Sequence, residues 1–345
     1  MTTAASTDRA RIGVVGLGYW GPNIARNLNA LEGCELAWCC DADEASRAKY
    51  GAVYPDAQFT GDFDEMLADD DLQAVAITTP VPSHGELASR ALEAGKHCFV
   101  EKPLAQDAAS AERLVQLADE RDLILMVGHL LCYHPGVRQL ADLISNGDLG
   151  EVYYLYSQRL NLGKLRADEN ALWSLGAHDI SVLLELAGAQ PTEVTARGES
   201  YVREGVEDVV FGYVRFDSGL AAHLHLSWLD PHKERRLTVV GSDRMATLDD
   251  MALERKLTIY DKGFDPAADT YGEYITRSGA VVSPSVPNDE PLRLECEHFL
   301  ECLADGSTPR TDGRAGVLVV QVLEALQTSL DSGGAPQPVG AAVGA

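Results

Sequence analysis

The chain has 345 residues, 46% of them hydrophobic and 23% charged, which is typical of a folded protein and excludes a largely disordered one. Its 53 acidic residues against 28 lysines and arginines give a formal net charge of -25 at pH 7. That charge argues against a nucleic acid or an anionic membrane surface as a partner. The length exceeds what one core usually holds, so we expect two domains.

The sequence shows no sign of export or membrane insertion. Its first ten residues lack the apolar core of a signal peptide, and no apolar run approaches the roughly twenty residues needed to span a bilayer. The seven cysteines are odd in number and include no Cys-x-x-Cys pair. We therefore expect a cytoplasmic protein with reduced thiols and no metal site.

The first predicted elements have the form of a dinucleotide site. A buried strand is expected over Ile12–Val15, a glycine-rich turn follows it, and a helix is expected over Pro22–Leu31. In such units the glycines let the backbone approach a pyrophosphate, the helix N-terminus faces it, and an acid after the second strand binds the ribose hydroxyls. The residues predicted to contact the cofactor here are Gly16, Gly18, Tyr19, Trp20, Gly21 and Asp41.

The acidic residues favour NAD over NADP. Asp43 follows Asp41 closely, and no arginine comes directly after Asp41. A 2′-phosphate would therefore meet two carboxylates, without an arginine directly after Asp41 to bind it. We predict NAD as the cofactor.

Short apolar runs alternate with helical patterns as far as Gly128. The runs are RIGVV, CELAWCC, LQAVAIT, KHCFV and LILMVG, with a shorter one expected near Asp56–Thr60. Strands that alternate with helices predict βαβ units and a parallel sheet with right-handed crossovers. We expect an α/β Rossmann domain over residues 1–128.

From Val152 onward the pattern changes to longer runs that alternate polar with apolar residues. Short turns join them, which predicts a large, mostly antiparallel open sheet, with a helical insertion over Glu169–Ala187. The segment Gly263–Pro291 carries three late prolines and is expected to be a long loop. Two helices are expected after it, over Leu292–Ala304 and Arg314–Leu330.

The second domain is thus expected to be an α+β domain over residues 129–332, followed by a flexible tail over residues 333–345. An open antiparallel sheet of this size exposes one face, and a second copy of the chain can cover it. We expect a homodimer or homotetramer formed through that sheet.

Residues that could take part in binding or catalysis follow two predicted strands of the first domain. Carboxyl ends of parallel strands are where ligands meet an open α/β sheet, so Lys102 points toward the nicotinamide end. For Lys102 the alternative is a solvated lysine before a helix-starting proline. For the segment from Thr78 to His84, which ends the fourth strand, the alternative is a proline-stiffened turn. Further predicted cofactor contacts are Thr78, Thr79, Pro80, His84, Glu101 and Lys102.

A histidine in the helical insertion is the second catalytic candidate. The i, i+4 spacing puts Ser174 and His178 on one helix face. A lone histidine is more often structural, but a lysine and a histidine from the two domains could meet where hydride moves. Oxidation of a secondary alcohol requires a base with a pKa near the working pH at the hydroxyl, and desolvation could adjust Lys102 to this task.

With these residues assembled, the chain resembles the glucose-fructose oxidoreductase and inositol dehydrogenase (Gfo/Idh/MocA) family over nearly its whole length. The resemblance rests on GLGYWGPNIARN, TTPVPSHGELASRALEAGKHCFVEKPLA and GDLGEVYYLYSQRLNLG. Within the family it is most similar to the UDP-N-acetylglucosamine and UDP-N-acetylglucosaminuronate 3-dehydrogenases, through RLNLGKLRADENALW, GAHDIS and PNDEPLRLECEHFLECLADGSTPRTDG. The resemblance implies that Lys102 and His178 lie at the reacting 3-hydroxyl.

The chain departs from the family pattern at two places. Ser174 stands where the family usually has an aspartate four residues before the catalytic histidine, and Asp179 faces about 100° away from His178 on a helix. Cys132 and His134 stand where many members carry arginine and asparagine. These departures leave the substrate and its oxidation state open.

We expect NAD-dependent oxidation of the C3 hydroxyl of a nucleotide-activated amino sugar, of the UDP-N-acetylglucosamine type, to the 3-keto sugar. Lys102 is the expected general base and His178 its hydrogen-bonding partner. One alternative is an NAD(P)H-dependent reductase of a keto sugar or cyclitol. A second is a non-catalytic cofactor-binding regulator, which the loss of the usual aspartate favours and the presence of both Lys102 and His178 disfavours. The expected substrate contacts are Tyr133, Arg166, Asn170, His178 and Asp179.

Overall fold

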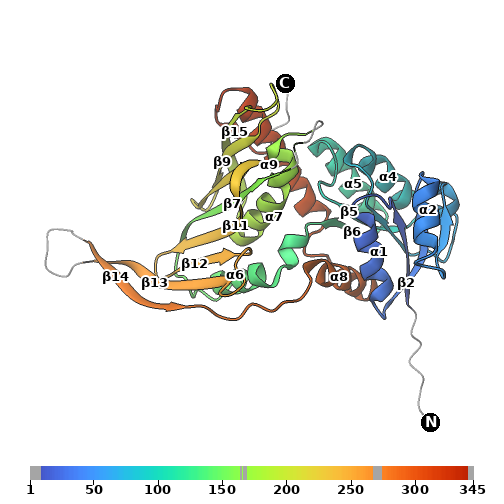
Figure 1. Ribbon diagram of the computed structural model, residues 1–345, viewed down its shortest axis with the longest axis horizontal. Coiled ribbons are helices and arrows are strands. Elements are labelled where there is room, and N and C mark those ends of the chain that lie inside the picture. The colour runs from blue at the N-terminus through green and yellow to red at the C-terminus, as the bar shows by residue number, and fades with distance from the viewer. Residues whose placement is uncertain (1–8, 164, 166–168, 267–273, 341–345) are drawn as a thin grey trace, which may run out of the picture. The chain divides into compact units, whose positions relative to one another are not determined.

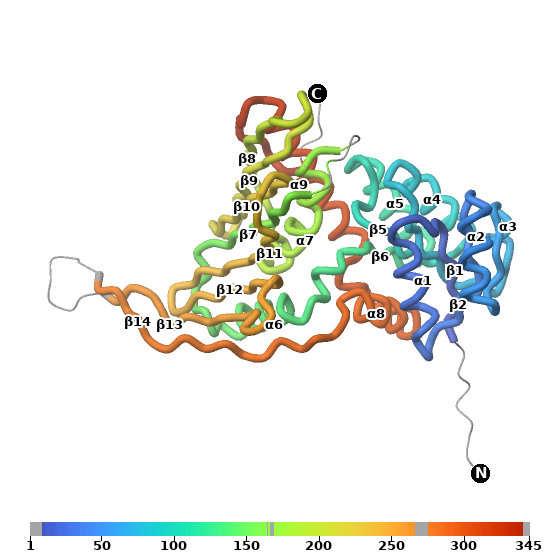
Figure 2. The backbone as a smooth tube through the Cα atoms, in the orientation of Figure 1, coloured from blue at the N-terminus to red at the C-terminus, as the bar shows by residue number. Residues whose placement is uncertain are grey.

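The computed structural model describes residues 9–163, 165, 169–266 and 274–340. The chain forms two compact units, of which the first contains the chain up to Leu130 together with Glu290–Val320. The second contains Leu131–Asp289 and the chain from Gln321 onward (Figure 2). The expected boundary after residue 128 lies close to the first crossing. The structure differs from the expectation in that the chain returns to the first unit near its end.

The first unit is built on a six-stranded parallel sheet in the order β3-β2-β1-β4-β5-β6 (Figure 1). The strand order reverses between β1 and β4, which creates the switch point where ligands of open α/β sheets bind. The central strands are apolar on both faces, as expected for a sheet covered on both sides. The strands are β1 (Ala10–Val15), β2 (Cys34–Cys40), β3 (Gln58–Thr60), β4 (Ala74–Ile77), β5 (His97–Glu101) and β6 (Leu125–Gly128).

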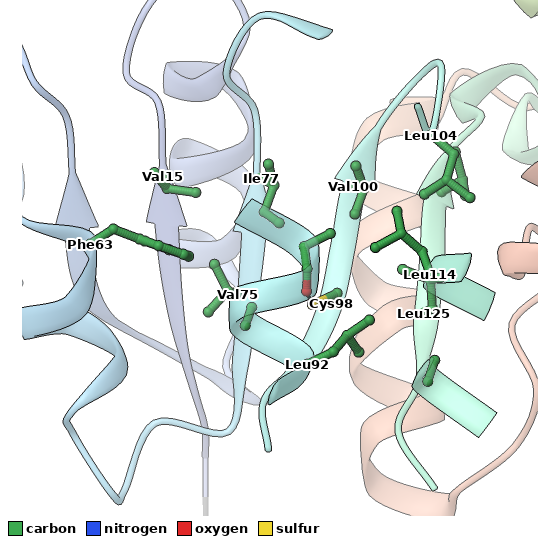
Figure 3. Close-up of a cluster of buried hydrophobic side chains, with 14 of the residues drawn as sticks. Val15, Phe63, Val75, Ile77, Leu92, Cys98, Val100, Leu104, Leu114 and Leu125 are labelled. Carbon is green, nitrogen blue, oxygen red and sulfur yellow. Dashed lines mark hydrogen bonds between the residues drawn. The ribbon is translucent and has the colours of Figure 1, made fainter. Parts of the chain in front are cut away.

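Helices cover both faces of this sheet. On one face, buried side chains of α3, α4 and α5 pack against the strands (Figure 3). On the other, α1 contacts α8, and Phe99 of β5 meets Phe299 of α8 edge to face at 5.7 Å between ring centroids. The helices are α1 (Gly21–Ala30), α2 (Glu44–Gly51), α3 (Phe63–Leu67), α4 (His84–Glu93), α5 (Ala108–Glu120) and α8 (Pro291–Asp305), with short turns η1 (Val81–Ser83) and η2 (Leu130–Tyr133).

The second unit is built on a nine-stranded sheet in the order β14-β13-β12-β11-β7-β10-β9-β8-β15. Only β7 and β10 pair in parallel, so the expectation of a large, mostly antiparallel sheet is confirmed. The strands are β7 (Val152–Leu162), β8 (Pro191–Glu199), β9 (Val209–Phe216), β10 (Ala221–Ser227), β11 (Leu229–Gly241), β12 (Met245–Asp249), β13 (Leu257–Pro266), β14 (Tyr274–Val282) and β15 (Gln337–Pro338).

Helices lie on one face of the second sheet. These are α6 (Pro135–Ser145), the π-helical turn η3 (Leu172–Gly176) and α7 (Ala177–Ala187), and α9 (Gly313–Asp331) begins in the first unit and ends in the second. Among the described residues, no helix has both the length and the apolar character that crossing a membrane requires.

Two expectations for the second half are wrong. The segment expected to be a long loop from Gly263 to Pro291 instead contains most of the β13–β14 hairpin, whose strands pair from Ile259 and Val282 outward. The three late prolines of the segment all follow β14. The β-branched residues that form β14 are interspersed with polar ones, so they gave only a weak strand signal. The expected flexible tail contributes β15, which pairs with Val194 of β8, and residues 341–345 lie outside the described part.

Candidate active site

The glycine turn between β1 and α1 has the geometry that a dinucleotide site needs. Gly16 has a φ of +94°, and a Cβ there would lie 2.8 Å from the backbone nitrogen of Thr79. A Cβ on Gly21 would lie 1.8 Å from the Gly16 carbonyl oxygen. A Cβ on Gly18 would meet nothing within 4 Å. Gly16 and Gly21 therefore close the turn, while Gly18 faces open space that a pyrophosphate can approach.

The groups around this turn fit a dinucleotide. The first turn of α1 has no side-chain cap, so its backbone N–H groups can bind phosphate oxygens. Asp41 accepts hydrogen bonds from the backbone nitrogens of Leu17 at 2.5 Å and Asp43 at 2.8 Å. Because each carboxylate oxygen can accept a second bond, Asp41 is still able to hold ribose hydroxyls. Tyr19 is 91% exposed, and Trp20 is the N-cap residue of α1.

The residues after β4 hold the turns together. Thr78 donates its hydroxyl to the carbonyls of Val15 at 3.0 Å and Gly16 at 2.6 Å. The buried His84 ring lies 2.8 Å from the Thr79 carbonyl and 2.9 Å from the Pro103 carbonyl. Burial lowers the pKa of His84. Direct cofactor contacts from Thr78, Thr79, exposed Pro80 and His84 stay predictions, and the observed contacts of Thr78 and His84 are structural.

The end of β5 places two ionisable groups side by side. Glu101 is buried, and its carboxylate accepts a hydrogen bond from the backbone nitrogen of Lys102 at 3.1 Å. Burial raises the pKa of Glu101 to about 7, although the Lys102 charge opposes the rise. Glu101 can therefore hold or release a proton near neutral pH, directly beside Lys102. The Lys102–Pro103 peptide bond is cis.

Two further buried groups, which the sequence predictions missed, interact electrostatically with this pair. His129 follows β6, which pairs with β5, and both of its ring nitrogens lack hydrogen-bond partners among the described residues. Burial, followed by the Lys102 charge, lowers the pKa of His129 to about 3, so the ring stays neutral. Glu295 of α8 is fully buried, and burial together with Glu101 raises its pKa well above its usual range.

The rule that strand ends carry ligands could have found His129, because it directly follows the sixth strand. No comparable sequence pattern pointed to Glu295. It comes from a helix near the end of the chain.

The pKa of Glu101 predicts a pH-dependent stability difference. Between its ordinary value of 4.5 and about 7, the folded protein keeps a proton on Glu101 that the unfolded chain has released. Wild-type stability therefore falls over this window as the pH rises. Glu101→Gln lacks this loss, so its melting temperature relative to wild type should rise between about pH 5 and about pH 8.

Thermal unfolding across that pH range measures the difference. Glu93→Gln is the matched control, because Glu93 is an exposed residue at the end of α4 and folding does not desolvate it. A Glu101→Gln difference that does not change with pH would contradict the assignment.

In the second unit, His178 lies in the first turn of α7. The preceding residues form a π-helical turn over Leu172–Gly176, so the four-residue spacing of Ser174 and His178 does not place them on one α-helical face. This corrects the spacing argument. The role of His178 at the reacting hydroxyl stays a prediction, because His178 and Lys102 belong to different units.

The other expected substrate contacts have structural partners or lie outside the described residues. Asn170 donates to Glu207 at 2.7 Å and to Gln327 at 2.9 Å. Tyr133 is 2% exposed. Arg166 lies outside the described part. Substrate contact by these residues stays a prediction.

Asp179 is tied to the sheet. Its buried carboxylate accepts hydrogen bonds from the hydroxyl of Ser157 and from Nε of Arg159, both on β7. These bonds fix the start of α7 on the sheet and set the direction of the Arg159 guanidinium.

A Rossmann sheet with this glycine turn, followed by a large open sheet, defines the class of two-domain dinucleotide-dependent oxidoreductases. Residues 10–129 match the family model described as "Oxidoreductase family, NAD-binding Rossmann fold", and residues 137–247 match the "GFO/IDH/MocA C-terminal domain". The chain belongs to the GFO/IDH/MocA oxidoreductase family, and its first unit is an NAD-binding Rossmann domain.

Its relatives include sugar dehydrogenases. The chain is 32% identical over 307 residues to UDP-N-acetylglucosamine 3-dehydrogenase of Acidithiobacillus ferrooxidans, covering 89% of this chain and 92% of that one. A solved structure of that enzyme superposes with a TM-score of 0.81 at 28% identity, covering 94% and 98% of the two chains. The chain is also 37% identical over 158 residues to dTDP-3,4-didehydro-2,6-dideoxy-alpha-D-glucose 3-reductase of Actinomadura kijaniata, covering 44% and 46%.

Proposed function

We propose that this protein oxidises the C3 hydroxyl of a UDP-N-acetylglucosamine-type sugar nucleotide to the 3-keto sugar with NAD. The observation that carries the proposal is Lys102 at the end of β5, beside a buried carboxyl that exchanges protons near neutral pH. The identity to a UDP-N-acetylglucosamine 3-dehydrogenase over most of both chains supports the choice of sugar. A cytoplasmic location stays a prediction.

In this reaction the cofactor and the protein side chains have separate roles. The glycine turn and Asp41 would hold NAD, which would supply the acceptor for the hydride at C3. Lys102 takes the proton of the C3 hydroxyl, so the substrate loses one hydride and one proton in total. Neutral His129 adds no charge beside Lys102, and Glu101 can accept or return a proton as Lys102 cycles.

The adenosine end favours NAD. Asp41 and the exposed Asp43 both carry carboxylates where a 2′-phosphate would sit, and Asp43 also caps α2. Comparison of kcat/KM for NAD and NADP tests this choice. A preference for NADP would contradict it.

The reaction is tested directly with UDP-N-acetylglucosamine deuterated at C3. The expected result is an absorbance increase at 340 nm with NAD, transfer of the deuterium to the nicotinamide, and a 3-keto sugar in the NMR spectrum. Tight NAD binding without turnover of any sugar nucleotide would instead favour a non-catalytic regulator.

Reduction of a keto sugar is the second candidate. The identity of 37% over 158 residues to a dTDP-keto-sugar 3-reductase favours it. The same residues support both directions, because hydride transfer is reversible. Assays that pair NADH or NADPH with keto-sugar nucleotides distinguish the two by their kcat/KM.

We also propose that the uncovered face of the second sheet joins two copies of the chain. Phe211 and Tyr213 of β9 are 53% and 38% exposed, and their neighbours on β10 and β7 are aromatic as well. Tyr156 stacks on His223 with ring centroids 4.9 Å apart, and Phe211 stacks on His225 at 4.4 Å. A continuous aromatic face of this kind favours association.

Phe211→Glu should convert a wild-type dimer or tetramer into smaller species, because it buries a charge in the interface. Light scattering coupled to size-exclusion chromatography measures the mass. Tyr201→Glu is the control, since Tyr201 is 72% exposed and lies outside the strands of the sheet. A monomeric wild-type protein would contradict the proposal.

A further inference from the structure

The second unit contains a basic cavity that none of the predicted site residues except Asp179 touches. Its volume is about 180 Å³. Its lining comes from α6, α7 and the neighbouring strands β7, β11 and β12, and includes four cationic side chains. These are Arg159, Lys233, Arg235 and Arg236. In a chain with a net charge of -25, such a gathering of cations requires an explanation.

Both carboxylates that line the cavity, Asp179 and Asp250, already have a cationic or hydrogen-bonding partner. Asp179 binds Arg159. Asp250 lies 3.1 Å from Nζ of Lys256 and 3.1 Å from Nε2 of His134. The hydrogen bond from His134, together with Lys256, lowers the pKa of Asp250 to about 2, so this carboxylate stays charged and engaged.

The charge of Arg236 is balanced by an ion pair, because its guanidinium lies 3.2 Å from the carboxylate of Asp249. Arg235 differs from the other arginines of the cavity. It donates to the carbonyls of Glu234 and Leu160 at 2.7 and 3.0 Å and to the side-chain oxygen of Asn161 at 3.0 Å. Within the described residues, no carboxylate lies at ion-pair distance from its guanidinium.

The register of the sheet sets this unpaired arginine against a second one. Arg235 of β11 pairs directly with Arg159 of β7, and both side chains line the cavity. Like charges directly opposite each other on a sheet are destabilising. Burial, followed by the charge of Arg159, lowers the pKa of Arg235 to about 10, although the charges of Asp179 and Asp250 oppose the fall. Lys233 lies two residues away on the same strand and adds a third cation.

The four cations that line the cavity outnumber its two carboxylates, Asp179 and Asp250, which favours a ligand that brings negative charge. Arginine presents a planar fork of donors that matches the paired oxygens of a phosphate or a carboxylate. The cavity is also close to the candidate chemistry in sequence, because Asp179, which orients Arg159, directly follows His178.

We propose that an oxyanion of the substrate binds between Arg159 and Arg235, with Lys233 at the rim of the site. This inference rests on the proposed function, since it assigns the anionic part of a sugar nucleotide to this cavity. The oxyanion can come from the diphosphate or from a carboxylate on the sugar. Both offer the paired oxygens that the two arginines recognise.

Isothermal titration of the NAD-saturated protein with UDP and with UDP-glucuronate tests the site. Arg235→Leu should weaken binding about 10- to 100-fold, which is the usual effect of losing a charge-assisted hydrogen bond. Arg235→Lys keeps the charge but not the fork and should give a smaller loss. Arg244→Leu is the matched control, because Arg244 is an exposed residue in the turn between β11 and β12 and does not line the cavity. The NAD affinities of these variants should stay at the wild-type value, because Arg235 and Arg244 both lie outside the dinucleotide site.

The two ligands distinguish the source of the oxyanion. Weaker binding of UDP to Arg235→Leu identifies the diphosphate. Unchanged UDP binding with weaker UDP-glucuronate binding identifies the sugar carboxylate. The site is refuted if wild type binds neither ligand, or if Arg235→Leu and Arg244→Leu bind both equally well.

The proposed reaction is judged separately by NADH formation. Binding of UDP that depends on Arg235, without NADH from any sugar nucleotide, would refute the reaction and leave the site standing. NADH formation with the same KM in wild type and Arg235→Leu would refute the site and leave the reaction standing.

Discussion

Replacing Lys102 with methionine is expected to lower kcat/KM by roughly 10²- to 10⁴-fold, the usual contribution of a positioned acid or base. Methionine keeps much of the side-chain length and cannot take the proton of the substrate hydroxyl. The loss should therefore appear in kcat, while the affinity for NAD changes little. Initial rates at 340 nm and a fluorescence titration with NADH measure the two quantities independently.

Lys49→Met is the control for this experiment, because Lys49 is an exposed lysine on α2. It should turn over at the wild-type rate. A folded Lys102→Met protein with near-wild-type kcat would refute the assignment of Lys102 as the base. A protein that loses NAD binding together with activity would assign Lys102 to cofactor binding instead.

Gly21→Ala is expected to be the most disruptive single-methyl change in the first unit. The new Cβ would lie 1.8 Å from the Gly16 carbonyl oxygen and 2.7 Å from the Thr78 hydroxyl. The first of these atoms is backbone, so the turn or the helix must move. We expect a loss of about 3 kcal/mol or more in the free energy of unfolding, at the upper end of overpacking effects. Denaturant unfolding measures it.

Gly18→Ala is the matched control within the same turn. Its Cβ would meet nothing within 4 Å, so the free energy of unfolding should change by less than about 1 kcal/mol, the cost or gain of a glycine substitution without a clash. The same methyl group occupies the space that a pyrophosphate must approach, and NAD affinity should fall. Wild-type NAD affinity in folded Gly18→Ala would contradict the placement of the pyrophosphate at this turn.

The local patterns of the chain were sufficient to predict the first sheet and the mostly antiparallel character of the second. All six strands of the first unit appear where alternating apolar runs indicated them, and so do the helices α8 and α9. The errors concern segments whose state depends on distant partners. The strand β14 is held by pairing with β13, and β15 by pairing with β8. Neither pairing is encoded in the few residues that form the strand.

The candidate site, too, could be predicted from the sequence only in part. Lys102 and Glu101 could be located because the carboxyl end of a parallel strand is a fixed place in an α/β sheet. The protonation of Glu101 could not be predicted, because its pKa of about 7 comes from burial, which depends on the tertiary packing around the strand end. Asp179 was expected at the substrate, whereas its observed partners are two side chains of β7.

The sequence by itself determined the glycine turn, the acid after β2 and the lysine after β5, because each depends on a few consecutive residues whose backbone geometry is local. These residues specify a dinucleotide oxidoreductase. Only the tertiary structure decided that Arg235 lies opposite Arg159, because sheet register follows from pairing between strands that are far apart in the chain. In this way, cationic side chains that are far apart in the sequence are brought together at one cavity.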